Sequence, residues 1–339
     1  MERIVSEKQL DGIVNANAAA SEKSGAEAPQ RESFFKTHSF QGYLEEGKKM
    51  EQPRELFPDV LVEHESSILF GDTGLGKSTF AIQIAEEVAR MGKKTMYVNF
   101  ELAQTQLAQR YQLKVFSENL RIATIDYALM HDVTEQGMML EEIERLAVED
   151  KVEVLVIDNF TNLCVNSKEG SEAGNIMLKL LSLRMQHKWT MLILAHVPKR
   201  KPGDPLTLND LAGSKIISNM VDNVVAINKS KKDKNMRYLI QLKYRSFPIE
   251  LDSKNVQELI MTTSDGWLHF ERGGYSEEVS HLPRSRDEKA ELERDIVKEL
   301  QNGLSYRDII DKLGTSMGTV QRVAQSHGFG KKTQKATRK

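Results

Sequence analysis

The sequence GDTGLGKS occupies residues 71–78 and matches the pattern G-x-x-x-x-G-K-[ST] in full. It follows the apolar run Ser67–Phe70 and precedes Thr79–Met91, in which apolar residues recur at helical spacing. A glycine-rich loop between a strand and a helix can wrap around an anion, because its N–H groups point inward and the helix N-terminus adds partial positive charge. The stretch therefore predicts a phosphate-binding loop, with a structural glycine-rich turn as the alternative.

The residues of this loop have separate expected roles. The three glycines let the backbone approach the phosphates, Lys77 supplies a point charge for the β- and γ-phosphates, and Ser78 offers a hydroxyl to Mg²⁺. We therefore expect ATP and Mg²⁺ as cofactors. The expected nucleotide-binding residues are Gly71, Asp72, Thr73, Gly74, Leu75, Gly76, Lys77, Ser78 and Thr79.

Strand and helix patterns alternate outward from the loop. Short apolar runs predict strands at Ser67–Phe70, Lys94–Phe100, Val152–Ile157, Thr190–Ala195, Asn223–Ile227 and Tyr238–Lys243. Helical spacing predicts helices at Thr79–Met91, Met139–Val148 and Gly174–His187. Two further strands, Val256–Thr262 and Gly266–Glu271, predict an antiparallel extension. This order predicts an α/β fold, a doubly wound sheet with a parallel core.

Three predicted strands end in polar residues at the edge of the sheet that carries the loop. Asp158 closes VLVID and would hold Mg²⁺ through water, and Glu101 would be the base or water-orienting group for hydrolysis. His196 would contact the γ-phosphate and report its presence. The alternatives are a loop-capping aspartate, a solvated glutamate and a histidine bonded to a backbone carbonyl.

These strand ends together resemble the RecA-like ATPase core, and more closely the hexameric replicative helicases of the DnaB and RepA kind and the related RadA-like ATPases. The resemblance rests on residues 71–78, MYVNFE at 96–101, VLVIDN at 154–159 and LILAHVPK at 192–199. In LAGSKIISNMVDNVVAI at 211–227, Asp222 precedes a strand as it does in the RepA class. The resemblance covers residues 53–271 and implies a RecA-like P-loop NTPase domain, a hexameric ring or filament, and ATP sites shared between subunits.

The resemblance assigns two further groups of residues. LKYRSFP at 242–248 has the Lys-x-Arg spacing of the helicase finger, so Lys243 and Arg245 would reach a neighbour's γ-phosphate, unless they form only a solvated basic strand. Single-stranded DNA would contact the loops Thr161–Gly174 and Val197–Gly213; the second carries Lys199, Arg200 and Lys201, and Lys215 follows it. The basic stretch at 230–237 fits a hairpin turn equally well. No helicase collar domain is recognisable, and the loops lack an aromatic residue for base stacking.

The C-terminal part reads as a small all-α domain. Residues 288–303 fit a helix, Ser305 can cap a helix at Tyr306–Leu313, and Thr315 or Ser316 can cap a third helix. Helix, glycine turn and helix resemble the helix-turn-helix of resolvase-like and regulator proteins, which would bind duplex DNA; a bundle for protein contacts is the alternative. The recognition helix would present Ser316, Thr319, Gln321, Arg322 and Gln325.

Length and composition limit the number of domains and the class of protein. The 339 residues suggest about two domains, and we expect an arm at 1–45 that is mostly disordered, an ATPase domain at 46–272, a linker at 273–287, a helix-turn-helix domain at 288–330 and a basic tail at 331–339. A short helix near Phe34 to Tyr43 would carry aromatic residues that pack locally or dock on a neighbouring subunit. No apolar run of about 18 residues is present, so we expect no membrane span. We expect a cytoplasmic protein without a signal peptide, and Cys164 as a small core residue.

The formal net charge of -2 conceals an asymmetry. Residues 284–339 hold 13 Lys and Arg against 8 Asp and Glu, so this end is basic and the remainder is acidic. Two functions fit these features: an ATP-driven DNA motor or remodeller of the RepA-like kind, in replication or recombination and possibly of a mobile element, and a regulatory DNA-binding protein whose nucleotide state controls oligomerisation. A signalling ATPase of the KaiC-like or RadA-like kind is a third interpretation.

Overall fold

A computed structural model describes residues 35–126, 138–164, 170–197, 204–211, 214–283 and 286–329. The chain divides into two units, Met1–Gln52 and Pro53–Lys339. In the first unit the helix α2 spans Phe40–Lys48, and the hydroxyl of Ser39 caps it by accepting from the Gly42 N–H. The sequence pattern indicated a helix near Phe34 to Tyr43, whereas α2 begins at Phe40, directly after the Ser39 cap. The aromatic side chains of Phe35, Phe40 and Tyr43 are exposed.

The second unit contains a nine-stranded sheet in the order β11-β10-β9-β8-β3-β7-β6-β4-β5. Its strands are β3 (Ser66–Gly71), β4 (Thr95–Asn99), β5 (Leu120–Thr124), β6 (Val154–Asp158), β7 (Thr190–His196), β8 (Asn223–Lys229), β9 (Met236–Lys243), β10 (Val256–Thr262) and β11 (His269–Ser276). The six strands from β8 to β5 are parallel, and β9, β10 and β11 are antiparallel to their neighbours. A small antiparallel pair, β1 (Glu55–Phe57) and β2 (Leu61–Val62), precedes them. The expected α/β fold with a parallel core is confirmed.

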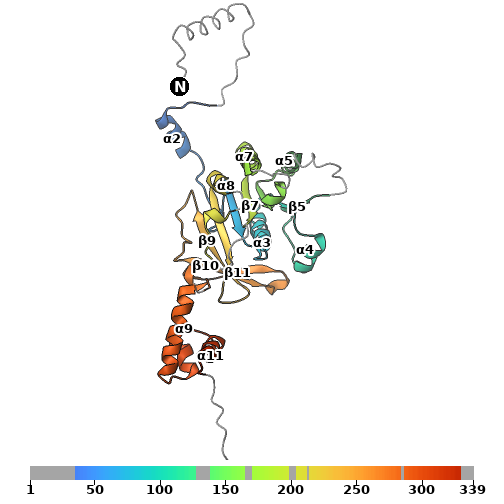
Figure 1. Cartoon of the computed structure of the whole chain (residues 1–339). Helices are drawn as coiled ribbons and strands as arrows, with labels where there is room; N and C mark the ends of the chain where they lie inside the picture. The colour runs from blue at the N-terminus through green and yellow to red at the C-terminus, as the bar shows by residue number, and fades with distance from the viewer. Residues whose placement is uncertain are drawn as a thin grey trace, which may run out of the picture. The chain divides into compact units, whose positions relative to one another are not determined.

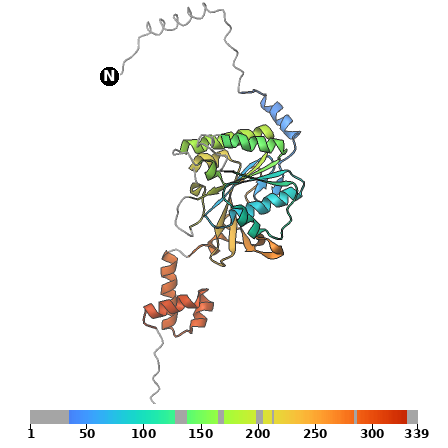
Figure 2. The same cartoon turned by 90° about the vertical axis from the view of Figure 1, so that its right-hand side faces the viewer.

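Helices cover both faces of the sheet (Figures 1 and 2). They are α3 (Lys77–Arg90), α4 (Gln104–Arg110), α5 (Met139–Glu149), α6 (Phe160–Leu163), α7 (Gly170–His187) and α8 (Ser214–Met220), with 3-10 turns η2 (Leu208–Asp210), η3 (Ser264–Gly266) and η4 (Glu278–Ser280). No helix among the described residues is long and apolar enough to cross a membrane.

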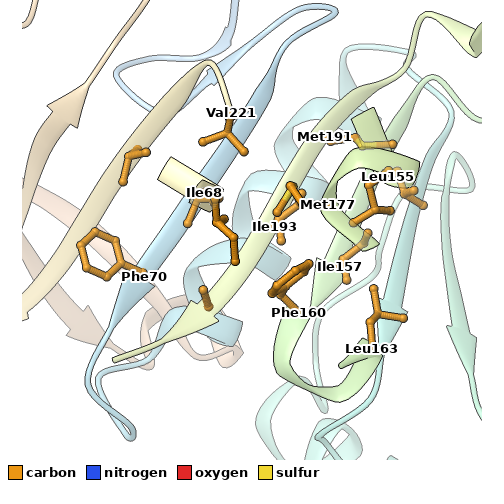
Figure 3. Close-up of a cluster of buried hydrophobic side chains, with 14 of the residues drawn as sticks. Ile68, Phe70, Leu155, Ile157, Phe160, Leu163, Met177, Met191, Ile193 and Val221 are labelled. Atoms are coloured by element: carbon orange, nitrogen blue, oxygen red, sulfur yellow. The ribbon is translucent and has the colours of Figure 1, made fainter. Parts of the chain in front are cut away.

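The core consists of two apolar layers because side chains alternate across a strand. Ile68 and Phe70 of β3 pack with α6 and α7 on one face, and Leu69 packs with α3 on the other. Figure 3 shows the first layer, in which Met177 and Phe160 lie over Leu155, Ile157 and Ile193. Every residue of β3 and of β6 is buried, as expected for central parallel strands. Cys164 is partly buried against the same layer.

The strand β11 extends to Ser276, and η4 follows it, so folded structure continues into the range where we expected a linker. His281 is fully buried there, between the hydroxyls of Ser230 and Ser276. The charged and glycine-rich composition that suggested a linker belongs instead to an edge strand with a solvent-facing side.

Three helices, α9 (Arg286–Gln301), α10 (Tyr306–Leu313) and α11 (Met317–Ser326), follow. Ser305 and Ser316 cap α10 and α11 with their hydroxyls, and Gly314 ends α10 with a φ of 56°. Ile296, Ile309, Val320 and Val323 form a separate small core. The helices thus have their own packed interior. The basic tail at 331–339 lies outside the described residues.

Candidate functional site

The phosphate-binding loop lies at the centre of the sheet, between β3 and α3. Gly71 cannot be replaced at this position, because an added Cβ would lie 2.3 Å from the carbonyl oxygen of Ile227. Gly76 has a φ of 94°, and its added Cβ would lie 2.6 Å from Cε of Met261. Gly76 is also the N-cap of α3, where the described residues provide no side-chain hydrogen bond to the first turn. The loop therefore presents backbone N–H groups at a helix N-terminus, which is the arrangement that binds phosphate.

Lys77 is held inside this loop. Its Nζ donates to the carbonyl oxygens of Gly71, at 2.9 Å, and of Asp72, at 3.0 Å, and the residue is only 6% exposed. Burial lowers the pKa of Lys77, and the nearby negative charge of Glu101, followed by those of Asp158 and Asp72, opposes that change. An ammonium whose closest partners are neutral carbonyls has a strong preference for an anionic oxygen. Its position fits the point charge of a phosphate site.

Replacing Lys77 with alanine should abolish ATP binding or turnover, because no other buried cation in the described part of the loop could neutralise the phosphates. Fluorescent-nucleotide titration and phosphate release measure the two effects. Normal turnover by Lys77→Ala would show that the phosphate loop is not part of the active site.

Asp158 lies beside the hydroxyl that follows Lys77. Asp158 is 1% exposed; it accepts a hydrogen bond from Ser78, and the hydroxyl of Tyr97 donates to its Oδ2 at 2.5 Å. Burial raises the pKa of Asp158, whereas the hydrogen bonds from Ser78 and Tyr97 oppose the change. Mg²⁺ binds few protein oxygens and keeps waters and substrate phosphates as its other ligands. A serine hydroxyl next to a buried carboxylate fits that ion, so Ser78 and Asp158 are the residues that would hold it.

Glu101 and His196 meet at the same edge of the sheet. Strand pairing places Asn99 opposite Asp158 and Gly71 opposite His196, so the ends of β4, β6, β7 and β3 are in line. His196 Nε2 lies 3.5 Å from Glu101 Oε2, and its Nδ1 lies 3.4 Å from Lys77 Nζ. The structure thus brings together the four strand ends that the sequence indicated.

Asn159 is a member of this cluster that sequence reasoning missed. Its side-chain amide contacts Glu101 Oε2 at 2.8 Å and His196 Nε2 at 2.9 Å. The only available signal was its position directly after Asp158, which does not reveal where the side chain points.

A cavity of about 410 Å³ opens over the loop. Beyond the phosphate-loop residues, Glu101 and His196, it is lined by Leu102, Gln106, Arg110, Met261 and Leu268. Arg110, Met261 and Leu268 supply a planar cation and two apolar side chains, which suit the face of a heterocyclic base. None of these three was predicted, because they come from α4 and from the distant segment around β10 and β11.

Lys243 and Arg245 lie at the opposite edge of the sheet. The strand β9 is antiparallel to β8: Arg237 pairs with Lys229 at the end of β8, whereas Lys243 pairs with Val224 near its start. Arg237 lies at the loop edge, where its Nε donates to the carbonyl of Leu75 at 3.2 Å. The six residues of β3 separate the two edges by roughly 20 Å.

The two cations have defined partners at that opposite edge. Lys243 Nζ donates to the carbonyls of Ser218, at 2.9 Å, and Val221, at 2.6 Å, and so satisfies the C-terminal end of α8. Arg245 Nη1 forms an ion pair with Asp222 Oδ1 at 2.9 Å while its side chain stays 56% exposed. Both cations therefore contact the segment at and just after the end of α8.

The expected DNA loops are only partly described. Lys199, Arg200 and Lys201 and the side chain of Lys215 lie outside the described residues. The stretch at 230–237 forms the turn between β8 and β9 and the first two residues of β9, and Lys232 in the turn pairs with Glu258 at 2.6 Å. The hairpin interpretation of that stretch is confirmed.

A family model described as an AAA domain matches residues 30–202. The chain belongs to the AAA domain family. The match includes the phosphate loop, Glu101, Asp158 and His196, and together with the sheet order it makes the chain a P-loop ATPase with a RecA-like fold.

Similar proteins carry the name DNA repair protein RadA. The protein from Campylobacter jejuni is 27% identical over 191 residues, which are 55% of this chain and 38% of that relative. The protein from Aquifex aeolicus is 28% identical over 166 residues, 49% of this chain and 34% of the relative. The chain thus spans less than two fifths of these relatives. A KaiC-like protein from Pyrococcus horikoshii OT3 aligns with 66% of this chain and 98% of its own, with a TM-score of 0.48 and 16% identity.

Proposed function

We propose that the chain hydrolyses ATP in an assembly of identical copies that acts on DNA. The observation that carries the proposal is the convergence of Lys77, Glu101 and His196 around one cavity at the edge of the sheet, with Asp158 bonded to Ser78 beside it. Glu101 would orient or deprotonate the attacking water, Lys77 would neutralise the phosphates, and His196 would contact the γ-phosphate.

ATP hydrolysis would use a finger from a neighbouring copy. Because Lys243 and Arg245 lie across the sheet from the loop of their own chain, they cannot supply charge to their own γ-phosphate. An arginine delivered by a partner stabilises the transition-state charge and links turnover to assembly. Head-to-tail contacts of this type generate rings or filaments, and a hexameric ring of the DnaB and RepA kind is the form that the Lys-x-Arg spacing favours.

DNA is proposed as the partner on two grounds. The similar curated proteins are named for DNA repair. In addition, α11 presents the exposed side chains of Gln321, Arg322 and Gln325 next to the cap formed by Ser316, and α10 and α11 are joined by a glycine turn. Amide and guanidinium groups on an exposed helix can donate to base edges in the major groove. We assign duplex DNA to this helix-turn-helix and single-stranded DNA to the loops that follow β6 and β7.

The second candidate function is a DNA-binding regulator in which ATP controls assembly without strand separation. The capped helix-turn-helix with its own apolar core favours it, because sequence recognition by duplex-binding helices is a property of regulators. The two candidate functions share the ATPase site. They differ in whether ATP hydrolysis drives strand separation or only controls assembly on DNA.

One set of measurements separates them. ATPase rates are compared without DNA, with single-stranded DNA and with duplex DNA, together with strand displacement and the mass of the assembly with and without ATP. Single-strand-stimulated hydrolysis with strand displacement supports the motor. Duplex binding with ATP-dependent assembly and no displacement supports the regulator. The absence of hydrolysis beyond that of Lys77→Ala under all conditions contradicts the proposed function.

A further inference from the structure

Asn159 occupies a position between the expected base and the expected γ-phosphate contact. It follows Asp158 at the end of β6 and is 3% exposed. Its amide nitrogen lies 2.8 Å from Glu101 Oε2 and 2.9 Å from His196 Nε2. No other described side chain is hydrogen-bonded to both of these groups.

The orientation of the Asn159 amide follows from its role as a helix cap. Asn159 is the N-cap of α6, and its Oδ1 accepts a hydrogen bond from the Asn162 N–H at 3.3 Å. Because the oxygen is committed to the helix, the NH₂ group must face the site. An amide NH₂ has two hydrogens, so one is donated to Glu101 and the other to His196.

This arrangement decides the tautomer of His196. A neutral imidazole has one donor and one acceptor nitrogen, so an Nε2 that accepts from Asn159 leaves the proton on Nδ1. Nδ1 lies 3.4 Å from Lys77 Nζ. The ammonium would donate to Nδ1 in the other tautomer, but the Asn159 contact with Nε2, at 2.9 Å, is the shorter of the two and assigns the acceptor to Nε2. With the proton on Nδ1, the imidazole and the ammonium lie side by side over the phosphate loop, where a phosphate oxygen can accept from both.

We propose that Asn159 is a positioning residue that couples His196 to Glu101. It fixes the His196 tautomer whose Nδ1–H faces the γ-phosphate, and with the same amide group it orients the Glu101 carboxylate. A displacement of His196 by phosphate is then transmitted to Glu101 through one side chain. This inference rests on the proposed hydrolytic function.

The test uses two variants that keep the helix cap. Serine and aspartate both cap helices well, but neither can donate two hydrogens. Asn159→Ser should lower kcat by about 100-fold, the order expected when a catalytic group is displaced by about 1 Å, and should change KM for ATP little. Asn159→Asp should lower kcat further, because an ionised carboxylate repels Glu101 and accepts from His196 instead of donating to it. Asn119→Ser is the matched control: it makes the same substitution at an amide that donates to the Ala89 carbonyl outside the cavity, and it should retain its basal ATPase activity.

The tautomer of His196 is measured directly on the ATP-free full-length chain by ¹⁵N NMR with labelled histidine, and the His196 signal is assigned by its loss in His196→Gln. The wild-type protein should show the Nδ1–H form; Asn159→Ser should lose this preference, and Asn159→Asp should show a proton on Nε2. A role limited to capping predicts wild-type kcat and an unchanged tautomer in Asn159→Ser, and that result would overturn the proposal. The NMR measurement needs no turnover, so it tests the contact between Asn159 and His196 even in an inactive protein. An inactive wild-type chain would contradict the proposed hydrolytic function alone.

Discussion

Replacing Glu101 with glutamine is expected to lower the rate of ATP hydrolysis by about 10³-fold, within the range for loss of a general base, while ATP still binds. Glutamine has the same shape and keeps an oxygen that can accept from the Asn159 amide. It cannot take a proton from water. The phosphate-binding contacts come from the loop and Lys77, which the substitution leaves in place.

Phosphate release and equilibrium nucleotide binding, measured on the same preparation, check this expectation. Glu87→Gln is the matched control, since Glu87 is an exposed glutamate of α3 that lines no part of the cavity. Hydrolysis by Glu101→Gln at the wild-type rate would place the base elsewhere.

Replacing Arg245 with alanine is expected to lower turnover by about 10³-fold or more, the effect of removing an arginine finger supplied by a neighbour. Folding should be little affected. The arginine side of its ion pair with Asp222 is 56% exposed, so the pair itself contributes about 1 kcal/mol. Asp222 is buried, but it keeps its bonds to Ser66 and its ion pair with Arg184.

Mixing two inactive variants tests whether the finger of one copy acts in the pocket of another. Lys77→Ala subunits lack a working loop but keep Arg245, and Arg245→Ala subunits have the opposite defect. When the two inactive variants are combined, a Lys77→Ala finger can complete an Arg245→Ala pocket, and part of the activity should return. Arg145→Ala, on the exposed face of α5, is the control and should be fully active alone. A mixture no more active than its components would show that the finger does not act between copies.

The sequence predicted the centre of this molecule well and its periphery less well. The strands β3, β6 and β7 were recognisable because strands buried on both faces read as unbroken apolar runs, and the residues at their ends were therefore placed correctly. The strand β5 was missed because Leu120–Thr124 lies at the sheet edge, has no fully buried residue, and is interrupted by Arg121 in its apolar pattern.

Side-chain partners could not be predicted in the same way. Asn159 and Arg237 act through atoms that are 37 to 162 residues away in the sequence. Lys243 was predicted as part of a finger, with a solvated basic strand as the alternative. The sequence did not indicate that it donates to carbonyl oxygens at the end of α8, because that contact depends on how β9 passes the helix.

The position of Lys243 and Arg245 across the sheet from their own loop gives every proposed assembly a direction. In an open row of copies, one terminal pocket has no finger and one terminal finger has no pocket, whereas a closed ring has neither. Activity per copy would therefore rise with the length of a row and level off, but would be the same for every copy of a ring. Dilution would lower the ATPase activity per copy, because shorter rows have more ends. A copy with a defective finger would inactivate the pocket of only one neighbour.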